Sequence, residues 1–206
     1  MKVVIAGDII NSQQNDPETF IKALKDILSE YSSDGLFQIY RGDSFQALLK
    51  RPELGMFVAL QLKSALKRSN GLDVRIAIGL GDVNVIQNDI AISKGSALIR
   101  SGQLLDSLKH KNQNLMVRSD HKLDYYMNNM LKMALLFMDN WTENAAEVIF
   151  EFLHNPHINQ EELGLKLGIQ QATVSRRLDR ANWKETGIVS GLFREYYKDV
   201  SNDSIL

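Results

Sequence analysis

Cysteine is absent from this sequence of 206 residues, which excludes disulfide bonds, thiolate zinc sites and cysteine nucleophiles. Proline occurs only three times, and no apolar run approaches the ~18 residues that a membrane-spanning helix requires. The first apolar run, Val3–Ala6, is too short for a signal peptide and is soon followed by Asp8. We therefore expect a cytoplasmic protein without membrane contacts, with a strand near its start.

The chain also lacks a strong excess of either charge, since its net charge at pH 7 is −1. A protein that only coats nucleic acid is usually basic, so any contact with DNA must come from a local basic patch. Hydrophobic residues make up 44% and charged residues 24%, ordinary values for a globular chain with a buried core. The length permits one large domain or two small ones.

Strand and helix signals alternate over the first 118 residues. Apolar segments rich in β-branched residues predict strands at 2–7, 36–40, 44–49, 74–80, 83–86 and 114–118. Helical spacing predicts three helices, which begin near Asp16, at Pro52 and at Ser93 or Ser96. The order βαββαββαβ indicates an α+β fold in which a mixed sheet has its helices on one face. This is close to the ferredoxin-like layout.

Strand signals stop at Ser119, and only helices are predicted beyond it. The longest covers 120–138, and five of the seven methionines lie between 116 and 138. Methionine-rich stripes adapt to irregular surfaces, so this helix either packs between domains or forms a dimer contact. The predicted division is an α/β domain (1–118), a connecting helix (119–140) and an all-α helix-turn-helix domain (141–206).

Residues 159–182 have the spacing of a helix-turn-helix. Asn159 is placed to cap a first short helix. Gly164 falls where two helices must approach closely, and Gly168 supplies a turn because glycine tolerates positive φ. Val174 and Leu178 form the inner face of a second helix. The pattern resembles the helix-turn-helix of many bacterial regulators.

The second helix of this segment offers polar and basic side chains that can contact DNA: Gln170, Gln171, Thr173, Ser175, Arg176, Arg177 and Arg180. Glutamine can read adenine and arginine can read guanine in the major groove, whereas hydroxyls reach phosphates. Between Gln170 and Lys184, four basic residues (Arg176, Arg177, Arg180 and Lys184) against one acid (Asp179) give a local charge of +3. The start of a recognition helix usually contacts base edges, which favours Gln171, Thr173 and Arg176. The alternative is a structural three-helix module that contacts proteins.

Two carboxylates stand out in the N-terminal domain. Asp8 ends the first strand, and Asp43 lies in the turn of the central hairpin. If these strands are neighbours, both side chains emerge near one end of the sheet. Paired carboxylates there can hold Mg²⁺ bridged to a phosphate. The alternative is structural, since aspartate is common in turns and hairpins.

The segments around these carboxylates carry a resemblance to a known family. Ala6-Gly-Asp-Ile-Ile-Asn-Ser12, Tyr40-Arg-Gly-Asp-Ser-Phe45 and Arg75–Gly81 resemble the catalytic domain of class III nucleotidyl cyclases, and the hairpin is similar to that of the palm-like diguanylate cyclases. The resemblance covers about residues 1–118 and implies Mg²⁺ on Asp8 and Asp43. It implies a nucleotide or phosphate ligand near Asn11, Ser12, Arg41, Gly42 and Ser44. The whole chain resembles the SatD-type family of small bacterial proteins.

The helix after Gly95 departs from the cyclase pattern. Those cyclases place an asparagine and an arginine there, where this chain has Ile99 and Gln103. Neither side chain can supply the positive charge that a phosphoryl-transfer transition state needs. Arg100 could substitute from an adjacent face of the helix. The pattern therefore favours a domain that binds a nucleotide without turning it over.

These observations favour a transcriptional regulator that binds double-stranded DNA as a homodimer. In this hypothesis the cyclase-like domain senses a nucleotide or a metal-phosphate ligand, and Mg²⁺ is its expected cofactor. The alternative is an enzyme, either a nucleotide cyclase or a related Mg²⁺-dependent nucleotidyl enzyme, with a DNA-targeting module. A third hypothesis is a protein–protein adaptor that binds neither DNA nor nucleotides.

Overall fold

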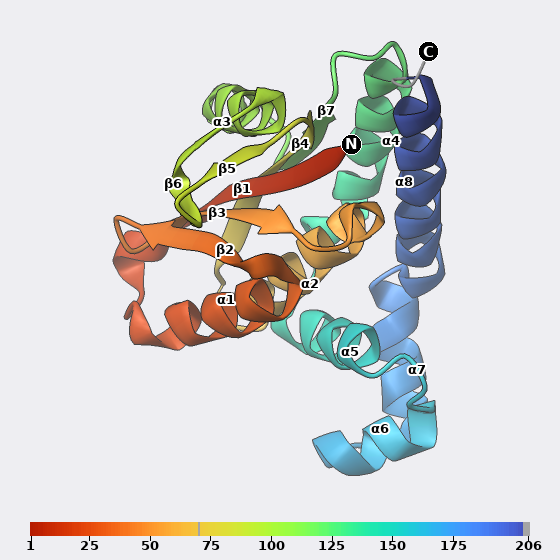
Figure 1. The fold of residues 1–206 in the computed structure, drawn as a ribbon. Coiled ribbons are helices and arrows are strands. Elements are labelled where there is room, and N and C mark those ends of the chain that lie inside the picture. The colour runs from red at the N-terminus through yellow and green to blue at the C-terminus, as the bar shows by residue number, and fades with distance from the viewer. Residues whose placement is uncertain (70, 204–206) are drawn as a thin grey trace.

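The computed structural model describes residues 1–69 and 71–203, and its N-terminal part is built around a five-stranded mixed sheet (Figure 1). The strands follow the order β2-β3-β1-β4-β7. Their bounds are β1 Lys2–Ile10, β2 Ser32–Tyr40, β3 Ser44–Leu49, β4 Asp73–Gly81 and β7 Leu115–Arg118. Strand β1 is antiparallel to both β3 and β4, whereas β7 is parallel to β4.

Helices cover both faces of this sheet, which corrects the expectation of helices on one face. Helices α1 (Glu18–Tyr31) and α2 (Gly55–Lys67) pack on the face that carries Val3 and Ile5. Helix α3 (Ser96–Leu108) packs on the opposite face, where Ala6 and Ala77 contact its leucines. Strands β1 and β4 are apolar on both sides, so each face of the sheet must be covered.

Close approach of α3 depends on a residue without a side chain. A Cβ atom at Gly79 would lie 2.3 Å from the carbonyl oxygen of Ala97, which is backbone that cannot yield. The same face holds a small second sheet of β5 (Asn84–Ile86) and β6 (Asp89–Lys94). The sequence predicted only the first of these two strands, because β6 is mostly exposed and its apolar run, Ile90-Ala-Ile92, is only three residues long.

Several predicted boundaries also differ. Strand β1 continues to Ile10, so Asp8 lies within the strand and does not end it. Strand β2 begins at Ser32 rather than at 36, and its register with β3 shifts between Ser32 and Phe37. Asp34 and Gly35 have positive φ at this irregularity, so the polar stretch bends the strand instead of separating it from α1. Helix α4 begins at Leu123 rather than at 120, because the residues before it form a turn stabilised by Asp124.

The C-terminal part consists of helices: α4 Leu123–Met138, α5 Glu143–His154, α6 Gln160–Leu167, α7 Gln171–Arg180 and α8 Trp183–Asp203. Figure 1 shows α4 and α8 side by side along the body, with α6 at the far end. Helix α8 returns to the N-terminal part, where Phe193 approaches Gly55 and the Tyr197 hydroxyl donates to the backbone oxygen of Met1. One hydrophobic cluster therefore runs from β1 through α2, α4 and α5 to α8.

A buried lysine joins the two parts. Lys63 of α2 is 2% exposed, and its Nζ lies 2.7 Å from Asp73 Oδ1 and 2.6 Å from Asp139 Oδ1. Lys67 adds a contact of 3.0 Å to Asp73 Oδ2 and donates to the backbone oxygen of Asp139. These contacts tie α2 to the start of β4 and to the end of α4.

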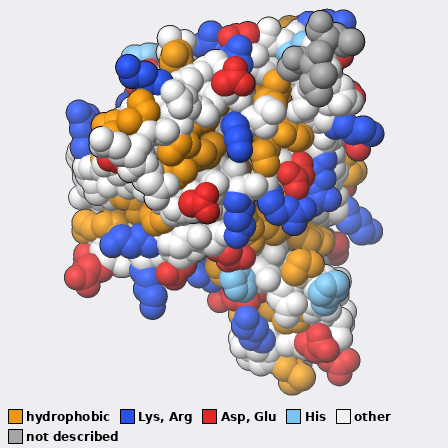
Figure 2. Space-filling view, viewed as in Figure 1, with side chains coloured by type: hydrophobic (Ala, Val, Ile, Leu, Met, Phe, Trp, Pro, Cys, Tyr) orange, Lys and Arg blue, Asp and Glu red, His pale blue; other side chains and the backbone are white. Residues whose placement is uncertain are grey.

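The distribution of charged side chains on the surface is mixed, as expected from the near-neutral composition. Lys, Arg, Asp and Glu side chains are interspersed over the face shown in Figure 2, and no large area of one sign dominates that face. Among the described residues, no helix combines the length and the apolar character needed to cross a membrane. A binding surface for a polyanion must therefore be local.

Candidate functional site

Helix α6 begins at a capping residue and ends at a glycine, both of which could be predicted from the sequence. The side chain of Asn159 accepts hydrogen bonds from the backbone N–H groups of Glu161 and Glu162, at 3.0 and 2.9 Å. The carboxylate of Glu162 accepts from the N–H of Asn159, which completes a capping box. Gly168 ends the helix at φ 67°, in the left-handed region. Both predicted roles, for Asn159 and for Gly168, are confirmed.

The turn between α6 and α7 is held by Gly164. The N–H of Ile169 donates to the carbonyl oxygen of Gly164 at 2.9 Å, and a Cβ atom on Gly164 would lie 2.7 Å from the oxygen of Ile169. The close approach expected at this position is confirmed. It fixes the angle at which α7 leaves the turn.

Gly164→Val is expected to destabilise the protein by about 1–3 kcal/mol, because the new side chain meets backbone atoms that must shift. The melting temperature measured by circular dichroism should fall. Gly187→Ala is the matched control, since a Cβ there meets nothing within 4 Å. The control should be neutral or stabilising, because alanine is the better helix former. Equal melting temperatures for Gly164→Val and the wild type would contradict the described packing.

Helices α5, α6 and α7 enclose a small core of their own. It contains the buried residues Val148, Leu163, Val174 and Leu178, with Phe152, Ile158, Leu167, Ile169 and Trp183 packed around them. The inward positions predicted for Val174 and Leu178 are confirmed. Burial of this side of α7 leaves the opposite side of the helix in solvent.

Four of the seven predicted DNA-contacting residues are exposed: Gln170, Gln171, Arg176 and Arg180. Thr173 and Ser175 are half-buried. Intramolecular bonds engage two of the exposed side chains: Gln171 donates to Gln160 at 2.7 Å, and Arg176 Nη2 lies 3.3 Å from the Thr173 hydroxyl. The exposed face of α7 therefore presents amides and guanidinium groups together.

Arg177 differs from the other predicted residues. Its Nη1 lies 2.9 Å from Glu147 Oε2 on α5, and its side chain is only 18% exposed. Its place in the sequence explains this, since a residue three positions after Val174 and one before Leu178 flanks the buried stripe. The carboxylate of Glu147 thus offsets one positive charge of α7.

The start of α5 contributes residues that sequence reasoning missed. Thr142, Asn144 and Ala145 line a hollow of about 430 Å³ together with Thr173, Arg176, Arg177 and Arg180. Thr142 caps α5 by accepting a hydrogen bond from Ala145, so its hydroxyl is already engaged. The exposed side chain of Asn144 is the missed residue best placed to bind beside α7. Only tertiary contact brings it there, so no local signal could have identified it.

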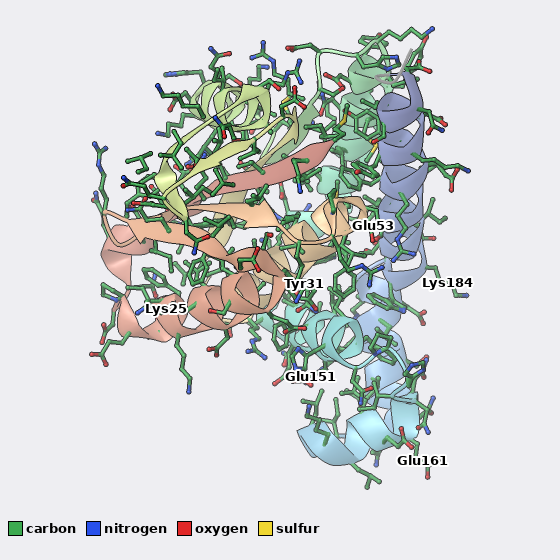
Figure 3. All side chains as sticks on the ribbon, in the orientation of Figure 1. Lys25, Tyr31, Glu53, Glu151, Glu161 and Lys184 are labelled. Atoms are coloured by element: carbon green, nitrogen blue, oxygen red, sulfur yellow. The ribbon has the colours of Figure 1, made fainter. Side chains whose placement is uncertain are left out.

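The α5–α7 unit is fixed to the rest of the molecule. Glu151 lies on α5 between the body and α6, whereas Glu161 extends from α6 at the far end (Figure 3). Glu151 contacts Lys166 of α6 at 2.5 Å and Arg68, which follows α2, at 3.8 Å. The indole N–H of Trp141 donates to the oxygen of Ala181 at 2.9 Å, between α7 and α8. These contacts hold α7 at a fixed position relative to the sheet.

A second candidate site lies at one end of the sheet. Asp8 pairs with Ser44 across β1 and β3, and the N–H of Ile9 donates to the oxygen of Asp43 at 2.9 Å. The structure thus brings Asp8 and Asp43 to the same end. The Ser12 hydroxyl donates to Asp43 Oδ2 at 2.9 Å, and the Ser44 hydroxyl lies 3.3 Å from Oδ1. A hollow of about 360 Å³ opens here, lined by Ile9, Ile10, Asn11, Ser12, Gln13, Asp43 and Arg75.

The two oxygens of Asp8 have different surroundings. Oδ2 lies 3.2 Å from Nη1 of Arg75, which stands opposite Asp8 on β4. Oδ1 is buried and has no hydrogen-bond partner in the protein. Sequence reasoning missed this role of Arg75, although the residue lies in a segment that it singled out. This orphaned carboxylate oxygen lies at the same end of the sheet as Asp43 and is a hard donor of the kind that Mg²⁺ prefers, whereas Asp8 itself does not line the hollow.

Other predicted ligand residues surround this hollow only in part. Asn11, Arg41 and Gly42 all lie in turns with positive φ, at 64°, 55° and 82°. Asn11 lines the hollow, whereas Arg41 is exposed at the tip of the β2–β3 hairpin. Within the described residues, no group of three or more His, Cys, Asp or Glu side chains is arranged to hold a metal ion. Any cation here would rely on two carboxylates, as Mg²⁺ bound with phosphate commonly does.

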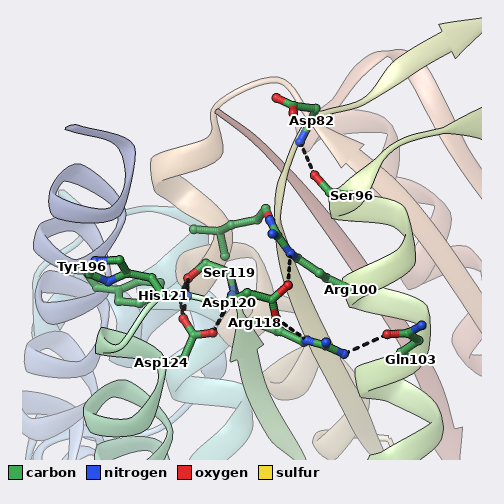
Figure 4. Close-up of polar contacts among 11 residues, drawn as sticks. Asp82, Ser96, Arg100, Gln103, Arg118, Ser119, Asp120, His121, Asp124 and Tyr196 are labelled. Atoms are coloured by element: carbon green, nitrogen blue, oxygen red, sulfur yellow. Dashed lines mark hydrogen bonds and ion pairs between the residues drawn. The ribbon is translucent and has the colours of Figure 1, made fainter. Parts of the chain in front are cut away.

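Arg100 lies elsewhere, which corrects its placement in the expected ligand set. Strand β4 runs antiparallel to β1, so α3, which follows β4 in the chain, begins at the opposite end of the sheet from Asp8. There Arg100 donates to the backbone oxygen of Leu80 at 2.6 Å and to Asp120 at 2.8 Å (Figure 4). Arg118 also binds Asp120, and this hydrogen bond together with the one from Arg100 lowers the pKa of the Asp120 carboxyl.

The same region joins α8 to the sheet domain. The Tyr196 hydroxyl donates to Asp124 Oδ1 at 2.5 Å and lies 3.0 Å from the Ser119 hydroxyl (Figure 4). Burial raises the pKa of the Tyr196 phenol, and the hydrogen bond to Asp124 raises it further. The tyrosine therefore keeps its proton and remains a donor. Because α8 directly follows α7, this bond helps to position the exposed helix.

Comparison with known proteins places the chain in a family. The model of the SatD family matches residues 2–185, which is most of the chain. The protein therefore belongs to the SatD family. Neither the curated proteins nor the solved structures compared with the chain gave a match.

Proposed function

We propose that the protein is a DNA-binding transcriptional regulator in which α6 and α7 form a helix-turn-helix. One observation carries the proposal: α7 buries Val174 and Leu178 and turns Gln170, Gln171, Arg176 and Arg180 toward solvent on its other side. Exposed glutamine and arginine on one helix are suited to reading adenine and guanine in the major groove. The fixed attachment of α7 supports a role in recognition, because readout needs defined geometry.

The local electrostatics support the same proposal. Arg176 and Arg180 are exposed and lie beside a hollow that also includes Asn144 of α5. Neutral donors at the start of α5 can hold a phosphate, while the guanidinium groups contact bases or the second strand. Glu161 and Glu162 lie in the first turn of α6 instead. Because carboxylates and phosphates repel each other, α7 and not α6 is the helix suited to the groove.

The function is tested by selecting duplexes from a random pool with the full-length protein and measuring their affinity by fluorescence anisotropy. We expect enrichment of a defined sequence that binds at least ~10³-fold more tightly than unrelated duplex at physiological salt. The affinity should fall steeply with salt concentration as counterions are released. Absence of any enriched sequence, with equal weak binding to all duplexes, would refute a regulator that reads an operator.

We further propose that the N-terminal domain is ferredoxin-like and binds a phosphate-containing ligand through a divalent cation. The order β1-α1-β2-β3-α2-β4 with spatial order β2-β3-β1-β4 supports the ferredoxin-like assignment. The unpaired Oδ1 of Asp8, at the same end of the sheet as Asp43, supports the cation. Ile99, exposed on α3, supplies no hydrogen-bond donor, which favours binding over nucleotide turnover.

Asp43→Asn is expected to abolish ligand-dependent stabilisation. With ATP, GTP or a cyclic dinucleotide plus Mg²⁺, the wild-type melting temperature should rise by a few degrees through mass action. The variant should show no rise, because the amide removes one of two charges that bind the cation. Glu195→Gln, at an exposed position on α8, should behave as the wild type. A rise that persists in Asp43→Asn would place the ligand elsewhere.

A further inference from the structure

Helix α4 is apolar on both of its sides, although only one side is covered. It buries Met127, Leu131, Leu135 and Met138 against the body. Its outer side nevertheless exposes Tyr125, Tyr126, Met133 and Leu136, each by 67–75%. A helix that is hydrophobic all round is typical of a buried helix. The outer side of α4 thus has the composition of a surface that another molecule covers.

Helix α8 extends this surface. Ile188 and Leu192 are 60% and 45% exposed, one helical turn apart. They flank the buried stripe of α8 on the side of Tyr196 that meets Asp124, which is the side next to α4. The two helices are antiparallel neighbours (Figure 1), joined at one end by the contact of 3.0 Å between His121 and Asp203. The outer face of α4 and this flank of α8 form a continuous apolar surface, named the α4–α8 face below.

The area of this face matches what a stable dimer requires. A large aromatic side chain can bury about 150–250 Å², and the exposed parts of the six apolar side chains together offer roughly 700 Å². Specific complexes bury about 800 Å² on each partner. Patches beyond a few hundred Å² are rarely left open on monomeric proteins and mark binding sites.

The charges around the face favour a second copy as the partner. The exposed charged residues here are the cations Lys132 of α4 and Lys122, which directly precedes that helix, because Asp124 is engaged by Tyr196. The flank of α8 carries the acids Glu185 and Asp199 on either side of Ile188 and Leu192. In a two-fold contact the same patch meets itself, so α4 of each copy can lie on α8 of the other. The lysines of each copy then face the acids of the other copy, so the same pairing occurs twice in the dimer.

We propose that the α4–α8 face is the interface with a second copy of this chain, related by a two-fold axis. The evidence for this interface is the exposed apolar face and the charges around it, and it does not depend on the proposed function. Its consequence for DNA rests on the proposed function: α7 leads into α8 within two residues, so pairing of the α8 helices fixes the separation of two α7 helices. Paired recognition helices read half-sites about one duplex turn, or a multiple of it, apart.

Sedimentation equilibrium without DNA tests the interface. The wild type should have twice the chain mass of 23.3 kDa at micromolar concentration. Met133→Glu with Leu136→Glu should weaken self-association at least ~100-fold and leave a monomer with an unchanged circular dichroism spectrum, since both side chains are exposed. Ile99→Glu with Leu165→Glu is the matched control, because these exposed residues lie on α3 and α6. The control should remain dimeric.

A charge swap tests the partner without altering apolar residues. Lys122→Glu with Lys132→Glu should weaken the dimer at least ~10-fold, and adding Glu185→Lys with Asp199→Lys should restore it. A wild type that stays monomeric at about 100 µM, a concentration at which even weak dimers with dissociation constants in the micromolar range form, would overturn the proposal. A dimer that survives Met133→Glu with Leu136→Glu would overturn it as well. A dimer that binds no DNA would leave the interface intact and refute the proposed function. A monomer that binds an operator would do the reverse.

Discussion

Replacement of both Arg176 and Arg180 by alanine is expected to lower the affinity for a selected duplex at least ~100-fold. The two guanidinium groups are exposed on the outer face of α7, and the hydrogen bonds of Arg176 stay within that helix. A contact to a base edge contributes about 1–3 kcal/mol, and each lost phosphate contact lowers the salt dependence of binding by about one unit. Fluorescence anisotropy across a salt series measures both quantities.

Lys22→Ala with Lys25→Ala provides the matched control, because it removes two exposed charges from α1 and leaves α7 intact. This variant should bind within ~2-fold of the wild type, as expected for charges more than a Debye length away. Melting temperatures of both variants should equal that of the wild type, which separates recognition from folding. If the arginine variant and the lysine variant bind equally well, α7 is not the helix that contacts DNA.

Lys63→Met is expected to cause the largest loss of stability, about 3–5 kcal/mol. The substitution keeps the apolar stem of a side chain that is 2% exposed but removes the charge that Asp73 and Asp139 share. Lys67 still contacts Asp73, whereas Asp139 loses its ion-pair partner. At about 2–4 °C per kcal/mol for a chain of this size, the melting temperature should fall by roughly 10 °C.

Urea unfolding of Lys63→Met gives the free energy directly, and Lys25→Met serves as its control. Lys25 is exposed on α1, so its replacement should change stability by less than ~0.5 kcal/mol. A loss below ~1 kcal/mol in Lys63→Met would show that the buried pair stabilises no more than a well-packed apolar group. The join between α2 and α4 would then depend on the hydrophobic cluster.

Features encoded by a few neighbouring residues could be predicted from the sequence. Asn159 and Glu162 form a capping box within four residues, and Gly168 supplies a backbone conformation that other residues avoid. The alternation of strands and helices likewise appeared in the apolar spacing. Local geometry decides these features, so no knowledge of distant contacts was needed.

Features that depend on distant contacts could not be predicted. Burial of β1 and β4 on both faces places α3 opposite α1 and α2, but an apolar run alone does not say which element covers which side. Because β4 is antiparallel to β1, Arg100 on the following helix lies at the far end of the sheet from Asp8. Lys63 resembles any helix lysine until the fold brings Asp73 and Asp139 around it.

The face of α7 proposed to contact DNA shows both what helical spacing can predict and what it misses. Helical periodicity placed Val174 and Leu178 inside and Arg176 and Arg180 outside, as the structure has them. It also shows in retrospect why Arg177 flanks the buried side, where Glu147 binds it. The contribution of Asn144 came from α5, about 30 residues earlier in the chain, and only tertiary packing brings it beside α7.

Recognition by α7 is tested by titrating ¹⁵N-labelled full-length protein with a selected duplex and following the binding by NMR. Backbone amide shifts should change most along Gln170–Arg180 and at Asn144, with smaller changes at α6. The side-chain amides of Gln170 and Gln171 should also shift. Binding that perturbs the sheet or α1 and leaves α7 unchanged would contradict recognition by this helix.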